Sequence, residues 1–93
     1  MVTLPPFRTA AAFAALLALS HTVWAALVLV GWAQPLTDFI FRLHFINPPW
    51  SIAPFDGGRA ALLVAFTGTV GAVVGLVVAL VWNAAQRLPV AKP

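Results

Sequence analysis

The chain has two long segments without Asp, Glu, Lys or Arg: TAAAFAALLALSHTVWAALVLVGWA, residues Thr9–Ala33, and AALLVAFTGTVGAVVGLVVALVW, residues Ala60–Trp82. The hydrocarbon core of a bilayer is about 30 Å thick, and a helix needs about 20 apolar residues to cross it. Lipid offers no water to backbone N–H and C=O groups, so each crossing segment must be an α-helix. The sequence therefore predicts an all-α membrane protein, a two-helix transmembrane hairpin with spans at 9–33 and 60–83.

Composition excludes several functional classes. Of the 93 residues, 62% are hydrophobic and 8% are charged, whereas soluble domains carry roughly 25% charged residues. The net charge of +3 comes from few and scattered residues, unlike the clustered basic face of a nucleic-acid-binding protein. The chain has no cysteine, and it offers no convergent set of polar groups for catalysis. We expect one domain over 1–93, with no enzymatic activity, no resident metal, no nucleic-acid partner and no soluble substrate.

The first span also has some features of a cleavable signal peptide, namely a basic residue before an apolar run and small residues after it. The apolar stretch continues to Val30, which is longer than the usual core of such a peptide, and we expect a retained anchor. For orientation, the two ends carry Arg8, Arg87 and Lys92, against Arg42 and Arg59 in the connector. The bias of Lys and Arg toward the cytoplasm predicts a bacterial inner-membrane protein with both termini cytoplasmic and a periplasmic connector.

The connector between the two spans is predicted to contain a short interfacial helix over 36–46 and an extended strap over 47–59. A tail over 84–93 is predicted to follow the second span. Apolar residues recur at helical spacing in the first of these segments, as Leu36, Phe39, Ile40, Leu43 and Ile46. A short, aromatic-rich amphipathic helix is suited to lie along a membrane surface. Asp56 is placed to cap the second span. We expect the connector's aromatic side chains to contact a partner, and these are Phe39, Phe41, Phe45, Trp50 and Phe55.

Small residues line one side of each predicted span. They recur at every fourth position, as Thr67, Gly71, Gly75 and Ala79 in the second span and as Ala14, Ala18 and Thr22 in the first, continuing to Ala26. Small residues let two helix backbones approach closely, which drives packing in lipid. The two lines could pack against each other within the chain, or one of them could receive a helix of another subunit.

His21 lies at the centre of the first span, and ionisable residues inside spans are functional candidates. Its imidazole could form a hydrogen bond to a backbone group or to the hydroxyl of Thr67 or Thr69. It could instead ligate the iron of a haem or the magnesium of a bacteriochlorophyll, or act as one step of a proton path. A mid-span histidine in an alanine-rich helix, followed by an aromatic, is similar to the light-harvesting polypeptides of purple bacteria. That resemblance implies pigment contact through His21, although those proteins place a small residue where this chain has Leu17.

The order of features over residues 10–84 is also similar to a family of small bacterial two-span proteins of unassigned function. The shared features are Trp24, Gly31-Trp32, a proline-containing connector, the glycine-stepped second span and Trp82-Asn83. This resemblance implies the hairpin fold and no particular activity.

These observations favour a non-catalytic accessory subunit of a larger bacterial energy-transducing membrane complex, photosynthetic or respiratory. Its expected partners are a larger integral membrane protein complex and the lipid bilayer. The alternatives are a self-associating small membrane protein, holin-like or channel-like, and a subunit that contacts bacteriochlorophyll or haem through His21. No other cofactor is expected.

Overall fold

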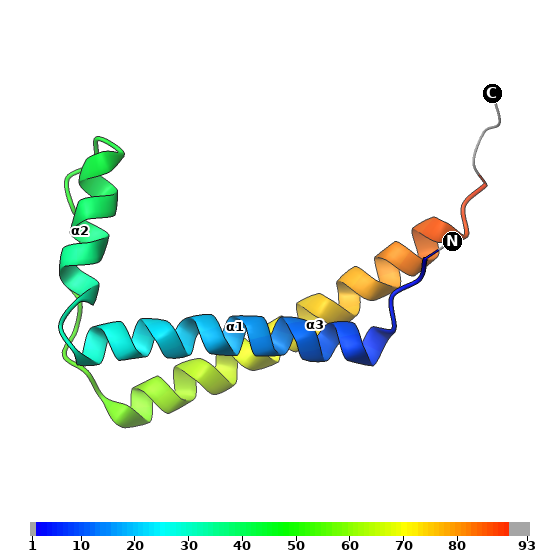
Figure 1. Cartoon of the computed structure of the whole chain (residues 1–93), viewed down its shortest axis with the longest axis horizontal. Helices are drawn as coiled ribbons and strands as arrows, with labels where there is room; N and C mark the ends of the chain where they lie inside the picture. The colour runs from blue at the N-terminus through cyan, green and yellow to red at the C-terminus, as the bar shows by residue number, and fades with distance from the viewer. Residues whose placement is uncertain (1, 90–93) are drawn as a thin grey trace.

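The computed structural model describes residues 2–89 of the chain, which form three α-helices and no strand. Helix α1 covers Pro6–Leu29, α2 covers Ala33–Leu43 and α3 covers Gly57–Gln86 (Figure 1). Helices α1 and α3 are long and apolar enough to cross a membrane, judged by length and composition. The all-helical class and the two long apolar helices predicted from the sequence are confirmed.

Helix α1 begins at Pro6 rather than Thr9 because a proline in the first turn sacrifices no hydrogen bond. It ends at Leu29, before the predicted limit, because Gly31 adopts the left-handed conformation with φ of +81°. The Trp32 N–H then donates to the Leu27 carbonyl over 2.9 Å, and the Gly31 N–H donates to the Val28 carbonyl over 3.2 Å. This pair of bonds is a Schellman motif, which satisfies the last carbonyls of a helix.

Helix α2 also ends in a Schellman motif, but with Phe45 in the position that glycine usually fills. The Ile46 N–H donates to the Phe41 carbonyl over 2.9 Å, and the Phe45 N–H donates to the Arg42 carbonyl over 3.1 Å. Phe45 has a φ of +62°. The helix starts at Ala33 and accommodates Pro35 in its first turn, so it lies earlier in the chain than the predicted 36–46 segment.

Helix α3 is capped as the sequence predicts: the Asp56 carboxylate accepts a hydrogen bond from the Arg59 backbone N–H over 3.2 Å. The helix runs on to Gln86, so it includes the beginning of the predicted 84–93 tail. Residues 90–93 of that tail, with Lys92, lie outside the described residues.

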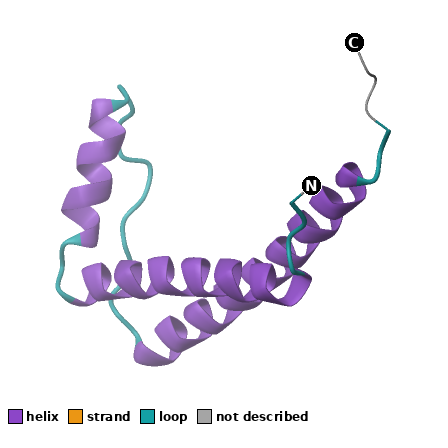
Figure 2. Cartoon of the chain, turned by 45° about the vertical axis from the view of Figure 1, so that its right-hand side comes forward, coloured by secondary structure: helices purple, strands orange, loops and turns teal. Residues whose placement is uncertain are grey.

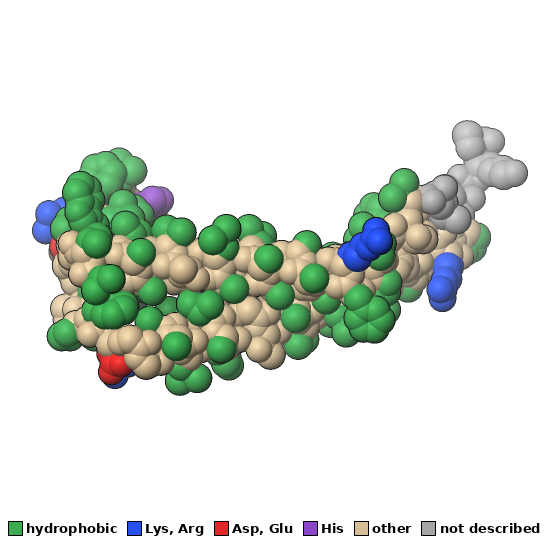
Figure 3. All heavy atoms as spheres, turned by 60° about the horizontal axis from the view of Figure 1, so that its bottom comes forward, with side chains coloured by type: hydrophobic (Ala, Val, Ile, Leu, Met, Phe, Trp, Pro, Cys, Tyr) green, Lys and Arg blue, Asp and Glu red, His purple; other side chains and the backbone are tan. Residues whose placement is uncertain are grey.

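Helices α1 and α3 run antiparallel and cross each other, while α2 stands across one end of the pair (Figures 1 and 2). The predicted strap, 47–59, is shorter in the structure, because residues 57–59 already belong to α3. The observed strap, residues 46–56, returns alongside α2 and leads into α3 (Figure 2). In the face drawn in Figure 3, charged side chains gather toward the two ends of the molecule and apolar side chains cover its middle. No charged residue lies between Arg8 and Asp38 or between Arg59 and Arg87, so the middle of the α1–α3 pair carries no charged side chain.

Candidate functional site

The small residues of α3 that recur at every fourth position, which we call the glycine line, pack directly against the backbone of α1 at Gly71 and Gly75. A Cβ atom added at Gly71 would lie 2.5 Å from the Phe13 carbonyl oxygen, and one added at Gly75 would lie 2.6 Å from the Thr9 carbonyl oxygen. Cβ atoms of real residues do not approach other heavy atoms that closely, so only glycine allows this spacing of the two helices. The buried residues of α3 are Thr67, Gly71, Gly75 and Ala79.

On α1, only part of the predicted small-residue line meets α3. Ala14 lies against Gly71, and the Ala18 methyl group lies 3.5 Å from the position of a Cβ on Gly68. Thr22 and Ala26 are exposed. The same four-residue spacing stays buried on α3 from Thr67 to Ala79, so only the line on α1 leaves the contact.

The half-buried side of α1 continues instead through His21. The His21 Nδ1 lies 2.8 Å from the Leu17 carbonyl oxygen; because a carbonyl only accepts, this nitrogen donates, and in a neutral imidazole Nε2 is then the nitrogen with the free lone pair. The hydroxyls of Thr67 and Thr69 both donate to carbonyls of their own helix. The imidazole therefore bonds to its own helix, and its Nε2 has the electronic form of a metal ligand whose other nitrogen is oriented by a backbone carbonyl. Residues 2–89 contain no group of three or more His, Cys, Asp or Glu that could hold a metal ion.

Asn83 fastens the beginning of the chain to the end of α3. The Leu4 N–H donates to Asn83 Oδ1 over 2.7 Å, and Asn83 Nδ2 donates to the Leu4 carbonyl over 2.8 Å. The neighbouring Trp82 Nε1 donates to the Val2 carbonyl over 2.9 Å. Sequence reasoning missed this contact, because nothing in the local pattern indicates that Asn83 would find its partner almost a full chain length away.

Gln34 fastens the strap to α2 in the same way. Its Nε2 donates to Asp38 Oδ1 over 2.8 Å and to the Trp50 carbonyl over 3.4 Å. Its Oε1 accepts a hydrogen bond from the Ile52 N–H. The Phe41 and Trp50 rings add an edge-to-face contact with centroids 4.9 Å apart. One amide side chain thus holds the backbone of an extended segment at two points.

The aromatic residues predicted to contact a partner are divided by the structure into two groups. Phe41 is half-buried beneath the strap. Four others remain exposed, namely Phe39, Phe45, Trp50 and Phe55. Phe45 is fully exposed, at the tip of α2. The apolar stripe of α2 is exposed as well, because the strap lies on the side that carries Gln34 and Phe41.

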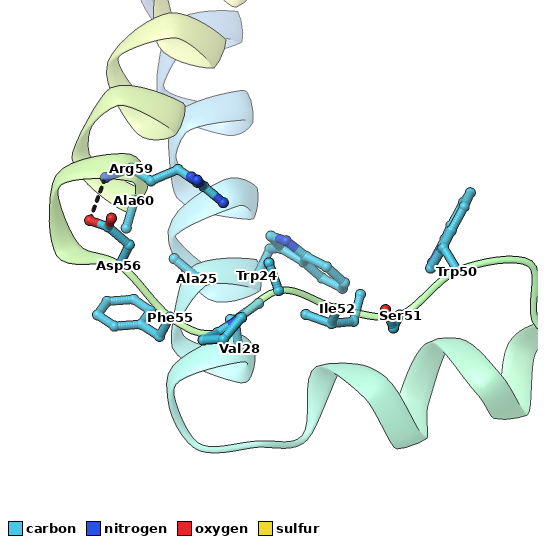
Figure 4. A pocket seen from close by; sticks show the side chains of 12 residues that line it. Trp24, Ala25, Val28, Trp50, Ser51, Ile52, Phe55, Asp56, Arg59 and Ala60 are labelled. Carbon is cyan, nitrogen blue, oxygen red and sulfur yellow. Dashed lines mark hydrogen bonds between the residues drawn. The ribbon is translucent and has the colours of Figure 1, made fainter.

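A cleft of about 380 Å³ opens where α1, the strap and the start of α3 meet. Its walls are mostly apolar, and Arg59 and Asp56 contribute its charged groups (Figure 4). The lining residues are Trp24, Ala25 and Val28 of α1, residues 50–55 of the strap, and Asp56, Arg59 and Ala60. Sequence reasoning did not predict this cleft, because it depends on the path of the strap.

No protein-family model matches this chain, and no curated protein or solved structure is significantly similar to it. Three structural features bear on function: the close α1–α3 contact, the exposed apolar surface of α2 and the cleft beside Arg59.

Proposed function

We propose that this chain is a non-catalytic accessory subunit of a larger bacterial energy-transducing membrane complex, photosynthetic or respiratory. It inserts as a two-span hairpin, with both termini cytoplasmic and the connector periplasmic, and attaches to the complex through α2. The observation that carries this proposal is the exposed apolar surface at α2 and its tip. The packed pair of α1 and α3 inserts into the membrane and holds α2 in position at its end.

The apolar side of α2 is exposed, and we expect a partner to bury it. Leu36, Phe39, Ile40 and Leu43 are all exposed on one side of an eleven-residue helix. Contiguous exposed apolar patches of this kind mark sites of contact with proteins or membranes. A helix that stands across the end of a membrane-spanning pair lies along the membrane surface, where one side faces lipid and an adjacent side can meet a protein wall.

Phe45 adds a second argument for a partner. A left-handed conformation costs an L-residue other than glycine about 1–2 kcal/mol, and a fully exposed phenyl ring has no compensating contact within the described part of the chain. Strained backbone positions of this kind cluster at functional sites. We interpret Phe45 as an anchor that enters a pocket of the host complex.

Self-association through the glycine line is less well supported, because α1 already fills that line. His21 Nε2 supports a secondary role as a pigment or haem ligand inside the host complex, since its Nδ1 is already oriented by Leu17. This secondary role would show as a haem or bacteriochlorophyll spectrum in the assembly that contains the chain.

Phe39→Ala tests the proposal against a matched control, Phe66→Ala. The two rings are similarly exposed, 62% for Phe39 on α2 and 64% for Phe66 on the face of α3 that would meet lipid. Native membranes are solubilised in mild detergent, and the chain is followed on a native gel together with the absorption spectrum of each band. We expect the parent chain and Phe66→Ala to migrate in a large coloured band, and Phe39→Ala to be released from it.

Phe45→Gly provides a second arm of the same experiment. Glycine relieves the left-handed strain, so this variant should fold at least as well as the parent chain while binding the complex less tightly. Migration of the parent chain as a small colourless species, or as a homo-oligomer, would contradict the accessory-subunit proposal.

A further inference from the structure

We infer that the cleft beside Arg59 binds one phosphatidylethanolamine molecule, with its acyl chain against the apolar walls and its head group between Arg59 and Asp56. The inference rests on the membrane insertion included in the proposed function, but it does not require the partner complex. It assigns a ligand to a cleft that no residue of α2 lines.

The cleft has the composition of a site for an amphiphile. Trp24 and Val28 of α1 and Ile52 of the strap form its apolar part, while Asp56 and Arg59 stand at one rim (Figure 4). Its volume of about 380 Å³ falls in the range of small-molecule sites, roughly 300–1,000 Å³. It is open rather than enclosed, so a chain that extends beyond it can still enter.

Arg59 is the group that recognises phosphate. The carboxylate of Asp56 is directed to the Arg59 backbone N–H, 3.2 Å away, and the Arg59 side chain extends away from that carboxylate, over the cleft toward Trp24 (Figure 4). A guanidinium offers a planar fork of donors that matches phosphate oxygens in pairs. The position of the cation over an apolar cleft therefore favours a ligand with a phosphate joined to a hydrocarbon chain.

The place of Arg59 in the fold identifies the source of that phosphate. Helix α1 ends at Leu29 and α3 begins at Gly57, so Arg59 lies in the first turn of the second long apolar helix. Arginine near the end of a membrane span reaches the head-group layer. At that depth a membrane phospholipid is the most abundant molecule that combines phosphate and hydrocarbon.

Asp56 selects among phospholipid head groups. Only its Oδ1 atom accepts the capping hydrogen bond, so its second oxygen can accept a bond from a ligand. The primary ammonium of phosphatidylethanolamine offers N–H donors next to the phosphate, whereas the quaternary ammonium of phosphatidylcholine has none. Phosphatidylglycerol brings a net negative charge close to the Asp56 carboxylate. The paired charges of the rim therefore fit phosphatidylethanolamine best.

Native mass spectrometry of the full chain in detergent, delipidated and titrated separately with the dioleoyl forms of the three lipids, tests this inference. We expect the first phosphatidylethanolamine to bind at least tenfold more tightly than phosphatidylcholine or phosphatidylglycerol. Arg59→Gln should weaken phosphatidylethanolamine binding about ten- to a hundredfold, as the loss of charge-assisted hydrogen bonds implies. Arg42→Gln is the matched control, because Arg42 is an exposed arginine outside the cleft, and it should bind as the parent chain does.

Asp56→Asn separates the role of Asp56 in head-group selection, which depends on its negative charge, from its role as a helix cap. Asparagine caps helices as well as aspartate does. This variant should lose the preference for phosphatidylethanolamine over phosphatidylglycerol while keeping its helical content by circular dichroism. Equal affinity of the parent chain for all three lipids, a preference for phosphatidylglycerol, or full binding by Arg59→Gln would overturn the inference. Failure of the membrane insertion itself would appear separately, as release of the chain from membranes by carbonate washing.

Discussion

Gly71→Ala is expected to weaken the association of α1 with α3 by about 1–3 kcal/mol, the usual cost of forcing extra volume into a packed contact. The added Cβ would lie 2.5 Å from the Phe13 carbonyl oxygen and 3.0 Å from the Ala14 Cα. Both atoms belong to the backbone, so neither can rotate away, and the two helices have to separate. Reversible unfolding of the purified chain in mixed micelles, followed by tryptophan fluorescence, measures this loss.

Gly57→Ala is the matched control for this prediction, because a Cβ added at Gly57 meets nothing within 4 Å. Alanine favours a helix interior over glycine by about 1 kcal/mol, and Gly71→Ala should lower stability despite that gain. Gly57 is the first residue of α3, where this preference is weaker, so Gly57→Ala should leave stability nearly unchanged. Equal stability of the two variants would show that the contact between Gly71 and Phe13 does not form.

Gln34→Ala is expected to release the strap from α2. The substitution removes the acceptor of the Ile52 N–H and the donor to the Trp50 carbonyl, and a backbone group left without its partner costs about 1–3 kcal/mol where water is scarce. We expect amide hydrogen exchange at Ile52 to become about tenfold faster or more. Because Ile52 lines the cleft, lipid binding there should weaken in parallel.

Gln86→Ala serves as the comparison for Gln34→Ala, since Gln86 is the last residue of α3 and lies at the opposite end of the helical pair from α2. It should leave exchange at Ile52 unchanged. Slow exchange at Ile52 in the Gln34→Ala variant would mean that the strap is held by the contact between Phe41 and Trp50 alone.

The sequence predicts the two long helices well because their determinants are local. The two charge-free apolar runs and Asp56 before α3 each lie within one continuous stretch of sequence. The proline that starts α1 at Pro6, ahead of the predicted Thr9, was not recognised. The end of α2 was harder to predict, because phenylalanine rarely adopts the left-handed conformation that Phe45 has.

The arrangement of the candidate sites depends on contacts between distant residues. The pairing of Asn83 with Leu4, and of Gln34 with Ile52, joins side chains to backbone groups far away in sequence. No periodicity encodes such pairs. The cleft follows from the second pair, since it exists only where the strap runs beside α1. The spacing also does not show where the line on α1 leaves the contact: Ala18 meets α3 but Thr22 is exposed, whereas the matching line on α3 stays buried from Thr67 to Ala79.

Oxidative cross-linking of Ala18→Cys/Gly68→Cys in carbonate-washed native membranes decides whether α1 and α3 pair inside the membrane as described. The chain has no cysteine of its own, and the Ala18 Cβ lies 3.5 Å from the Cβ position of residue 68, within the disulfide range of about 3.5–4.5 Å. Thr22→Cys/Gly68→Cys is the control, since Thr22 is exposed. We predict a disulfide within one chain for the first pair and none for the control. Disulfides between chains, or none at all while both cysteines of the first pair react with maleimide, would contradict the hairpin.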